Sequence, residues 1–480
     1  MSLKINHSLT ARGLLPKLTR VFELSAQKID ALQRIWDPGQ GTPVFTVRGK
    51  YTSRGWTEWT QGFQFGSALL QFDATGEERF LELGRRNTVR HMASHVSHIG
   101  VHDHGFNNIS TYGNLWRLMR EGKIPANEQE QNFYELALKV SGAVQAARWT
   151  DLGCGTGFIY SFNGPHSLFV DTMRSLRSLA VAHQLGHVLM GERDRRINLL
   201  QRLIVHAVMT AAYSVYYGEA RDAYDVRGRT AHECIFNVID GSFRCPNSQQ
   251  GYSPFTTWTR GLAWAILGFA EQLEFLSGVP EKQIGKALIE FTEDCRWPGK
   301  KRISLPGNPR QLRVLLLRAA TATADFFIEN TCRDGIPMWD TGAPNLHRLG
   351  NYLDRNADPY NAWEPVDSSA AVIAAQGLVR LGEYLRQQDQ SGEARRYLQA
   401  GLTVASALFD APYLSTQPKH QGLLLHSLYH RPNGWDFIAR GQKVPNGESS
   451  MWGDYHSLEL ALLLLRQAQN HPPLLFSGLG

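Results

Sequence analysis

Two kinds of helical pattern alternate along this chain of 480 residues, and the alternation limits the folds open to it. One kind repeats apolar residues every three or four positions with charges between them, as in a helix with one solvated face. The other kind is rich in Ala, Gly, Ser and Leu with few charges, as in a helix buried on all sides. The first kind covers residues 12–34, 78–97, 129–147, 194–216, 309–330 and 391–408, and the second covers 58–72, 107–120, 169–190, 258–276, 367–387 and 452–468.

Six helices of each kind in alternation predict an all-α fold, an (α/α)6 toroid with six inner and six outer helices. Strand-like alternation is scarce, and a helical pattern near 281–295 fits neither series. No linker rich in Pro, Gly and Ser divides the chain, so we expect residues 1–480 to form a single catalytic domain.

The loops before the predicted inner helices share an unusual composition of Trp, Asp, His and Ser or Thr. They read RGWTEWTQGF, GVHDHGF, NGPHSLFVD, QQGYSPFTTWTRG, NAWEPVDSS and NGESSMWGDY. Helix capping explains single Asp, Ser and Thr residues but not this composition in six loops. We expect the loops to converge on one mouth of the toroid and to form the functional site.

Charge and cysteine content exclude several classes of protein. The net charge of +6 is spread along the chain without a Lys/Arg run, so neither a nucleic acid nor a membrane is an expected partner. No run of about 18 apolar residues predicts a membrane span. Five cysteines without a C-x-x-C pair suggest reduced, structural thiols and a cytoplasmic protein, or a periplasmic one if a signal peptide was removed.

The stretch DLGCGTG at 151–157 resembles the AdoMet-binding turn of class I methyltransferases. Such a turn must follow a buried strand and precede a helix. Here it follows the end of an amphipathic helical pattern, and Asn163-Gly164-Pro165 breaks any helix after it. We therefore interpret it as a connector toward the loop that delivers Asp171, and we expect no cofactor. A second local pattern, TAHECIFNVIDGSF, predicts a hairpin that turns at Asp240-Gly241.

Six segments together resemble the signatures of glycoside hydrolase family 88, the unsaturated glucuronyl hydrolases, with the unsaturated rhamnogalacturonyl hydrolases of family 105 as relatives. They are GVHDHGF, QQGYS, WTRGLAWAILGFAEQL, VDSSAAVIAAQGL, LLLHSLYHRPNG and SMWGDYHSLEL, and the match runs from about Trp56 to Leu465. The fold that this resemblance implies is similar to the toroid predicted above.

The resemblance implies hydration of a C4=C5 double bond in a sugar left by a polysaccharide lyase. Asp171 opens an inner helical pattern, so from the residues alone it is a helix N-cap or a functional carboxylate. Within the family pattern it matches the general acid/base, which protonates C4 and takes a proton from the water that attacks C5. Asp103 matches the second active-site carboxylate. Two carboxylates facing one pocket push their pKa values apart, and we expect burial beside Asp103 to raise the pKa of Asp171.

The substrate-binding residues follow partly from the resemblance and partly from spacing. His232 and Gln250 match family pocket positions, although His232 can instead be a structural histidine, and His102 beside Asp103 is a further candidate. Arg260 and Trp264 share one helix face, where Arg260 requires an anion, either a uronate or a structural salt bridge, and Trp264 can stack on a sugar. Weaker candidates for the same mouth are Trp56, Trp59, Ser368, Ser369, Trp452 and Tyr455, and the two serines can instead cap a helix.

The chain departs from the family pattern in three places. Arg174 and Ser175 interrupt a run that is commonly Met-Met-Asn-Leu, Gln249 stands where His is common, and the irregular segment 334–363 is long. His91, His95 and His98 lie on one helical face, but no Cys or carboxylate ladder completes a metal site, so no metal is expected.

The predicted function is a glycoside hydrolase that acts on unsaturated uronic-acid oligosaccharides. Two alternatives remain: another carbohydrate-active enzyme on the same toroid that acts on a saturated or otherwise modified sugar, and a non-catalytic sugar-binding toroid.

Overall fold

Two concentric series of helices form the chain in the computed structural model, which describes residues 2–55, 58–289, 303 and 305–478. The inner series is α2 (Gln61–Thr75), α5 (His104–Asn108) with the π-helical turn η4 (Ile109–Gly113) and α6 (Asn114–Arg120), α8 (Thr172–Ser175) with α9 (Arg177–Gln184), α11 (Thr259–Gly278), α14 (Ser368–Gln387) and α16 (Met451–Ala468). The outer series is α1 (Leu15–Ile35), α3 (Glu78–His91) with α4 (Ala93–Val96), α7 (Glu128–Ala147), α10 (Leu199–Tyr213), α13 (Pro309–Glu329) and α15 (Ser391–Leu408).

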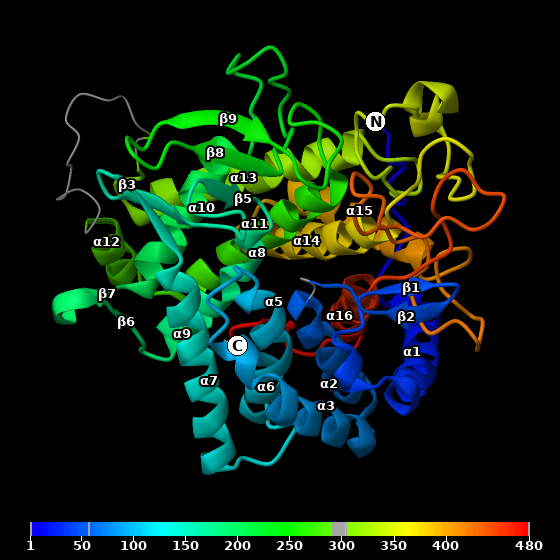
Figure 1. Cartoon of the computed structure of the whole chain (residues 1–480), viewed down its shortest axis with the longest axis horizontal. Coiled ribbons are helices and arrows are strands. Elements are labelled where there is room, and N and C mark those ends of the chain that lie inside the picture. Colours follow the sequence, from blue (N-terminus) through cyan, green and yellow to red (C-terminus); the bar gives the residue numbers. More distant parts are fainter. Residues whose placement is uncertain (1, 56–57, 290–302, 304, 479–480) are drawn as a thin grey trace.

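The inner series closes into a ring, because α16 packs against both α2 and α14. In Figure 1 the red α16 accordingly lies beside the blue α2, although the two are at opposite ends of the sequence. The predicted toroid is confirmed, with ten of the twelve predicted helices within a few residues of their places. The helix predicted over 169–190 ends early, at Gln184, and the one predicted over 194–216 begins late, at Leu199, because β6 (Leu189–Met190) and β7 (Arg196–Ile197) lie between them. The unassigned pattern near 281–295 begins with α12 (Glu281–Ile289), and the rest of that pattern lies outside the described residues.

Small residues let the inner helices approach one another. A Cβ atom on Gly377 of α14 would lie 2.7 Å from the main-chain nitrogen of Leu267 in α11. A Cβ on Gly268 of α11 would lie 2.8 Å from the main-chain nitrogen of Arg174 in α8. The Ala- and Gly-rich composition that marks these helices in the sequence is therefore what close helix packing around a ring requires.

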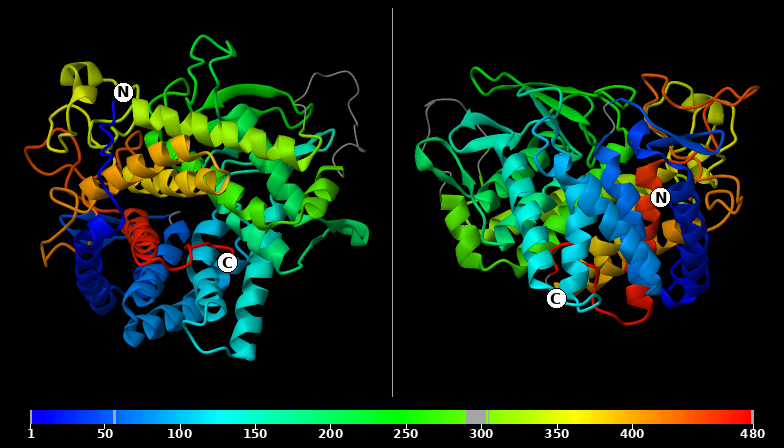
Figure 2. Two further views of the ribbon diagram at one scale, coloured as in Figure 1. Left: turned by 180° about the vertical axis from the view of Figure 1, so that it is seen from behind. Right: turned by 60° about the horizontal axis from the view of Figure 1, so that its bottom comes forward.

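Short strands connect the helices, most of them in the segments that lead into inner helices, whereas β6 and β7 follow the inner helix α9. The strands are β1 (Phe45–Val47), β2 (Lys50–Thr52), β3 (Trp149–Gly153), β4 (Thr156–Ile159), β5 (Ser167–Phe169), β6 (Leu189–Met190), β7 (Arg196–Ile197), β8 (Glu233–Phe236) and β9 (Phe243–Asn247). Short 3-10 turns are η1 (Arg12–Leu14), η2 (Pro38–Gln40), η3 (Glu58–Thr60), η5 (Glu192–Asp194), η6 (Leu346–Leu349) and η7 (Tyr352–Asp354). The right-hand view of Figure 2 shows the β8–β9 hairpin and the long loops gathered at the same end of the helices.

One three-stranded antiparallel sheet, in the order β5-β8-β9, positions three segments of the site. Phe169 pairs with Glu233, and Glu233 pairs with Asn247. The residues just after β5, just before β8 and just after β9 therefore lie together at one end of the three strands. The predicted hairpin is confirmed as β8 and β9, with Gly241 in the left-handed region at φ 70°. The prediction of a helix from residue 169 is wrong at its start, because the apolar run there pairs with β8 as a strand.

The DLGCGTG stretch is the β3–β4 hairpin, so a strand follows its turn instead of the helix that a nucleotide loop needs. Gly153, Cys154 and Gly155 all have positive φ. Glycine adopts this conformation at little cost in free energy, so two of the three positions are not strained. Cys154 is disulfide-bonded, whereas Cys234, Cys245 and Cys332 are free. The expectation of reduced cysteines is therefore wrong at Cys154.

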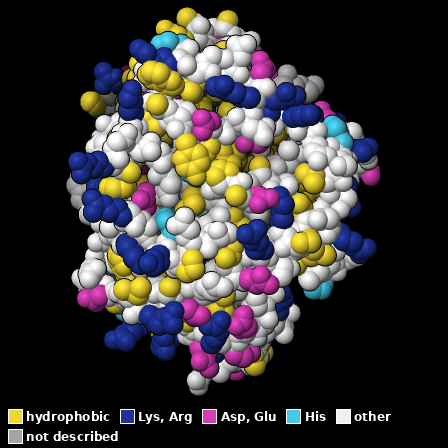
Figure 3. Space-filling model, turned by 90° about the vertical axis from the view of Figure 1, so that its right-hand side faces the viewer, with side chains coloured by type: hydrophobic (Ala, Val, Ile, Leu, Met, Phe, Trp, Pro, Cys, Tyr) yellow, Lys and Arg dark blue, Asp and Glu magenta, His cyan; other side chains and the backbone are white. Residues whose placement is uncertain are grey.

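On the face in Figure 3, side chains of both charge signs are interspersed around an apolar group near the centre. Among the described residues no single helix is long and apolar enough to cross a membrane. The pair α11 and α12 passes such a test only jointly, and the two are bent by 116°.

Candidate active site

A cavity of about 550 Å³ opens among the loops at the end of the toroid that carries β8 and β9. Four of the six predicted loops reach it, namely those before α2, α5, α8 and α11, and a further loop between α15 and α16 completes the wall. The side chains and main-chain groups that line it belong to Trp59, His98, Gly100, Val101, His102, Asp103, Phe106, Phe162, Asp171, Gln249, Gln250, Trp258, Arg260, Trp264, Tyr429, His430, Asn433 and Trp435.

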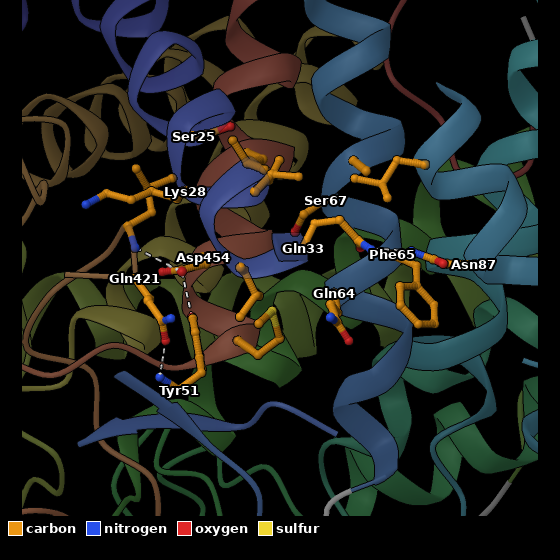
Figure 4. Close-up of a pocket in the computed structure, with 17 residues that line it drawn as sticks. Ser25, Lys28, Gln33, Tyr51, Gln64, Phe65, Ser67, Asn87, Gln421 and Asp454 are labelled. Atoms are coloured by element: carbon orange, nitrogen blue, oxygen red, sulfur yellow. Dashed lines mark hydrogen bonds between the residues drawn. The ribbon is translucent and has the colours of Figure 1, made fainter. Parts of the chain in front are cut away.

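A second cavity, of about 40 Å³, lies between α1, α2, α3 and α16 (Figure 4). Polar groups around it are already paired: the Tyr51 hydroxyl donates to Asp454 over 2.6 Å, and the Tyr51 main-chain N–H donates to Gln421. A space of this size holds a few water molecules and no sugar ring. The larger cavity is therefore the candidate active site.

Asp103 and Asp171 both face the larger cavity, and His102 lies between them. His102 Nε2 is 3.3 Å from Asp171 Oδ1 and 3.9 Å from Asp103 Oδ1. Both aspartates occupy helix N-cap positions, but neither side chain makes a capping hydrogen bond. Asp367, by contrast, caps α14 by accepting from the main-chain N–H of Ser369. Capping therefore does not explain Asp103 or Asp171, and their carboxylates are directed to the cavity.

The pKa values of the two carboxylates move in opposite directions. Burial raises the pKa of Asp103, and the nearby charge of Asp171 adds to this rise. Burial alone would also raise the pKa of Asp171, but the hydrogen bond and the charge of His102 bring it below its ordinary value. The two pKa values are separated, as expected. The expectation that the pKa of Asp171 is raised is wrong for the free protein, because the contact of Asp171 with the imidazole of His102 could not be predicted from the sequence.

His102 interacts with both carboxylates, but its hydrogen bond is to Asp171. Burial would lower its pKa, but the charges of Asp103 and Asp171 and the hydrogen bond to Asp171 raise it above its ordinary value. Phe162 stacks on the ring at 6.2 Å and Phe169 meets it edge-on at 5.6 Å, which fixes its plane. Because Nε2 faces a carboxylate, it carries a proton within reach of Asp171.

His232 lies behind the cavity wall and holds two wall residues. Its Nδ1 accepts from the main-chain N–H groups of Gln249 at 3.1 Å and Gln250 at 3.3 Å. Burial lowers the pKa of His232 to about 4, so the ring is neutral and its remaining proton lies on Nε2. His232 is itself 2% exposed. The structural interpretation of His232 thus accounts for its Nδ1, and a contact to substrate through Nε2 stays a prediction.

Arg260 meets its anion within the protein. Its Nη1 is 3.1 Å from Asp367 Oδ2, and its Nη2 donates to Gln250 Oε1 at 2.8 Å. The guanidinium also donates to the main-chain carbonyls of Leu428 and Tyr429. Of the two alternatives for Arg260, the structural salt bridge is the one observed. Its edge lines the cavity, where it holds Gln250 in place.

Two of the predicted aromatic residues line the cavity. Trp264 packs against Phe106 at 5.0 Å on the wall, and Trp59 lies on the same wall. Trp452 and Tyr455 do not line it: Trp452 is fully buried under Trp59, 5.1 Å away, and Tyr455 packs in the core against Phe63. These two predictions are wrong because both side chains are buried against other aromatic rings and do not reach the cavity. Trp56 lies outside the described residues.

Ser368 and Ser369 do not line the cavity either. The Ser368 hydroxyl donates to the main-chain carbonyl of Leu425 at 2.7 Å, and the Ser369 hydroxyl donates to Asp367 at 2.6 Å. Ser369 Oγ also accepts from Trp452 Nε1. Both serines are fully buried, so they organise the start of α14 and make no contact with the cavity.

The loop between α15 and α16 contributes residues that sequence reasoning missed. Tyr429, His430, Asn433 and Trp435 line the cavity from this loop. Asp436 holds its turn by accepting from the main-chain N–H of Tyr429 at 2.5 Å and of His430 at 3.1 Å. The signal was present in the segment YHRPNGWD, which combines aromatic and amide side chains with turn residues. This segment does not directly precede a predicted inner helix. The expectation that functional residues lie in the loops before the inner helices therefore did not include it.

The histidines near the site form hydrogen bonds with neighbouring residues and do not form a metal-binding cluster within the described residues. His95 Nδ1 contacts Asn107 Nδ2 at 3.1 Å, and His104 contacts Ser141 and the carbonyl of His98. Over the described ranges, no group of three or more His, Cys, Asp and Glu side chains is placed to hold a metal ion.

The chain is similar in sequence to known hydrolases of unsaturated sugars. No protein-family model matches it. An unsaturated glucuronyl hydrolase of Bacillus sp. (strain GL1) is 24% identical over 426 residues, which cover 87% of this chain and 89% of the relative. An unsaturated chondroitin disaccharide hydrolase of Streptococcus pyogenes serotype M1 is 22% identical over 459 residues, 93% of this chain and 90% of the relative.

Solved structures agree with the sequence comparison. The crystal structure of the Bacillus sp. GL1 unsaturated glucuronyl hydrolase superposes with a TM-score of 0.66 at 21% identity, over 94% of this chain and 95% of that one. The Streptococcus agalactiae unsaturated glucuronyl hydrolase gives 0.66 at 19% identity, over 98% and 94%. The chain resembles the unsaturated glucuronyl hydrolases. The resemblance predicted from the sequence is confirmed, and the relation to family 105 stays a prediction.

The departures from the glucuronyl hydrolase pattern differ in their relation to the cavity. Arg174 is fully buried, pairs with Glu271 and Glu459, and does not line the cavity. Ser175 donates to the carbonyl of His102 at 2.5 Å and accepts from the N–H of Gly105 at 2.9 Å, so it anchors the turn that carries Asp103. Of the residues at these departures, only Gln249 lines the cavity.

Proposed function

We propose that this chain is a glycoside hydrolase that releases the unsaturated uronic acid from lyase-generated oligosaccharides by hydration of the C4=C5 double bond. The observation that carries the proposal is the pair of non-capping carboxylates, Asp103 and Asp171, on either side of His102 in the cavity. The relatives support it, since they are named as hydrolases of unsaturated glucuronyl or chondroitin-disaccharide substrates. A neighbouring structure, an aspartate-to-asparagine variant of the Streptococcus agalactiae protein, holds dGlcA-GalNAc6S.

In this proposal Asp171 donates a proton to C4, and water adds to C5 while giving its proton to the same carboxylate. The product is a hemiketal, which opens and expels the rest of the oligosaccharide. Asp171 must hold a proton before the first step, although His102 keeps it ionised in the free protein. One transfer across the 3.3 Å contact moves the proton from His102 Nε2 to Asp171. The uronate favours this transfer, since its negative charge raises the pKa of a nearby carboxyl group.

The aromatic walls fit a sugar substrate. Trp59, Trp264 and Trp435 offer faces on which a pyranose ring can stack. We further propose that residues 1–480 act as one catalytic domain, because the first and last inner helices pack together and complete the ring under the cavity. No cofactor takes part in the proposed reaction, since protonation and water addition need only the carboxylates and the imidazole.

The decisive experiment follows the ultraviolet absorbance of the conjugated double bond. Disaccharides made by lyases from chondroitin, heparin, hyaluronan, gellan, xanthan and ulvan are incubated with the protein. Loss of absorbance with release of the second sugar supports hydration. Sugar release without loss of absorbance would instead establish an enzyme for saturated or modified sugars. Absence of turnover on every product, with binding that survives Asp171→Asn and Asp103→Asn, would establish a non-catalytic binder.

A further inference from the structure

Two adjacent glutamines on the cavity wall are held by partners that fix which end of each amide faces the cavity. Gln249 and Gln250 follow β9 directly and both line the cavity. An amide has a donor end and an acceptor end, so its orientation is known once one end faces a group that can only donate or only accept. Both glutamines have such a group in their network.

The orientation of Gln249 is set from a buried carboxylate. Glu233, 1% exposed, can only accept, so Asn163 presents its Nδ2 to Glu233 Oε1 at 3.1 Å. Asn163 Oδ1 then faces Gln249 and can only accept, so Gln249 donates to it from Nε2 at 3.3 Å. Gln249 Oε1 is the end that remains, and it accepts no hydrogen bond within the described part of the chain. Gln249 thus offers an acceptor to the cavity.

The orientation of Gln250 is opposite. Arg260 can only donate, and its Nη2 lies 2.8 Å from Gln250 Oε1. The amide nitrogen of Gln250 is therefore the end left for a ligand. Neighbouring residues of the same type thus present opposite polarity, because one is anchored to a carboxylate through an asparagine and the other to a guanidinium.

We propose that Gln249 orients the sugar by accepting a hydrogen bond from one of its hydroxyl groups through Oε1, while Gln250 serves the acceptor groups of the substrate. This inference rests on the proposed function for the identity of the substrate. A uronate carboxylate can only accept, so it cannot pair with Gln249 Oε1 and is directed to the Gln250 side. The sugar is then fixed in one of its two orientations along this wall.

The test compares variants by their KM and kcat on the lyase disaccharide that the wild-type protein hydrates. Gln249→Met keeps the length of the side chain and removes both polar atoms. Loss of one neutral hydrogen bond predicts a KM about 3- to 10-fold higher with kcat changed less. Asn163→Ala removes the anchor of Gln249 and is expected to raise KM in the same direction by a smaller factor.

Asn247→Ala is the matched control. Asn247 Nδ2 also donates to Glu233, at 2.7 Å, but Asn247 has no bond to Gln249. We expect its KM to equal that of the wild type. An equal rise of KM in Asn163→Ala and Asn247→Ala would show a general effect of Glu233 on the sheet and would overturn the inference.

Calorimetric binding of the same disaccharide separates this inference from the proposed function. A wild-type chain that binds without turnover would refute the proposed function, and the affinity of Gln249→Met would still test Gln249. Unchanged KM and affinity in Gln249→Met would overturn the inference alone, with the proposed function intact.

Discussion

Replacement of Arg260 by Met tests whether this side chain holds the site together or binds the uronate. Arg260 is 1% exposed and its guanidinium has four acceptors in the protein, one of them the carboxylate of Asp367. Without Arg260, Asp367 becomes a fully buried carboxylate without its cation. Removing one partner of a buried ion pair costs about 3–5 kcal/mol. We therefore expect Arg260→Met to lower the free energy of unfolding by about this amount.

Urea denaturation followed by tryptophan fluorescence, together with scanning calorimetry, measures the effect. The double variant Arg260→Met/Asp367→Asn should be more stable than Arg260→Met, since Asn still caps α14 and leaves no charge behind. Arg386→Met is the matched control, because Arg386 pairs with Glu383 on the surface and should change stability little. An Arg260→Met protein as stable as the wild type, with a raised KM, would show that the guanidinium serves the substrate and would refute this reasoning.

Three further outcomes are expected. Asp171→Asn and Asp103→Asn should each lower kcat/KM by about 10²- to 10⁴-fold with unchanged circular dichroism, and near-normal turnover in both would remove their catalytic assignment. In the pH profile of kcat, His102→Gln should move the alkaline limb to lower pH. The raised pKa of His102 keeps the proton needed by Asp171 in place as pH rises, so an unmoved limb would argue against that role. Ser369→Ala should leave KM unchanged, since Ser369 does not line the cavity, and a several-fold rise in KM would place it at the substrate after all.

The helical ring was predictable because close packing leaves its mark on composition. Gly268 and Gly377 lie where a side chain would collide with the next helix, so small residues together with a lack of charges mark the inner helices in the sequence. The interruptions of the inner series were not predictable. The π-helical turn at Ile109–Gly113 and the strand before Asp171 arise from tertiary pairing, which the helical period does not encode.

The site was predictable in its outline and less so in its details. Asp103, Asp171, His102, Gln250 and Trp264 all reach the cavity. Buried Ser, Trp and Tyr at the starts of inner helices resemble site residues in composition, and only the direction of each side chain separates the two. The low pKa of Asp171 depends on an imidazole 69 positions away in the sequence, which no local pattern relates to it.

The wall of the cavity is divided between two kinds of chain segment. His102, Asp103 and Asp171 belong to turns pinned by the ring and by the β5-β8-β9 sheet, whereas Tyr429 to Trp435 arrive on the excursion between α15 and α16. In the proposed function, the carboxylates and the imidazole therefore lie on other segments than the one that completes the wall. Under that proposal, exchange of the 429–435 segment between such toroids would change the wall and leave Asp103, Asp171 and His102 in place.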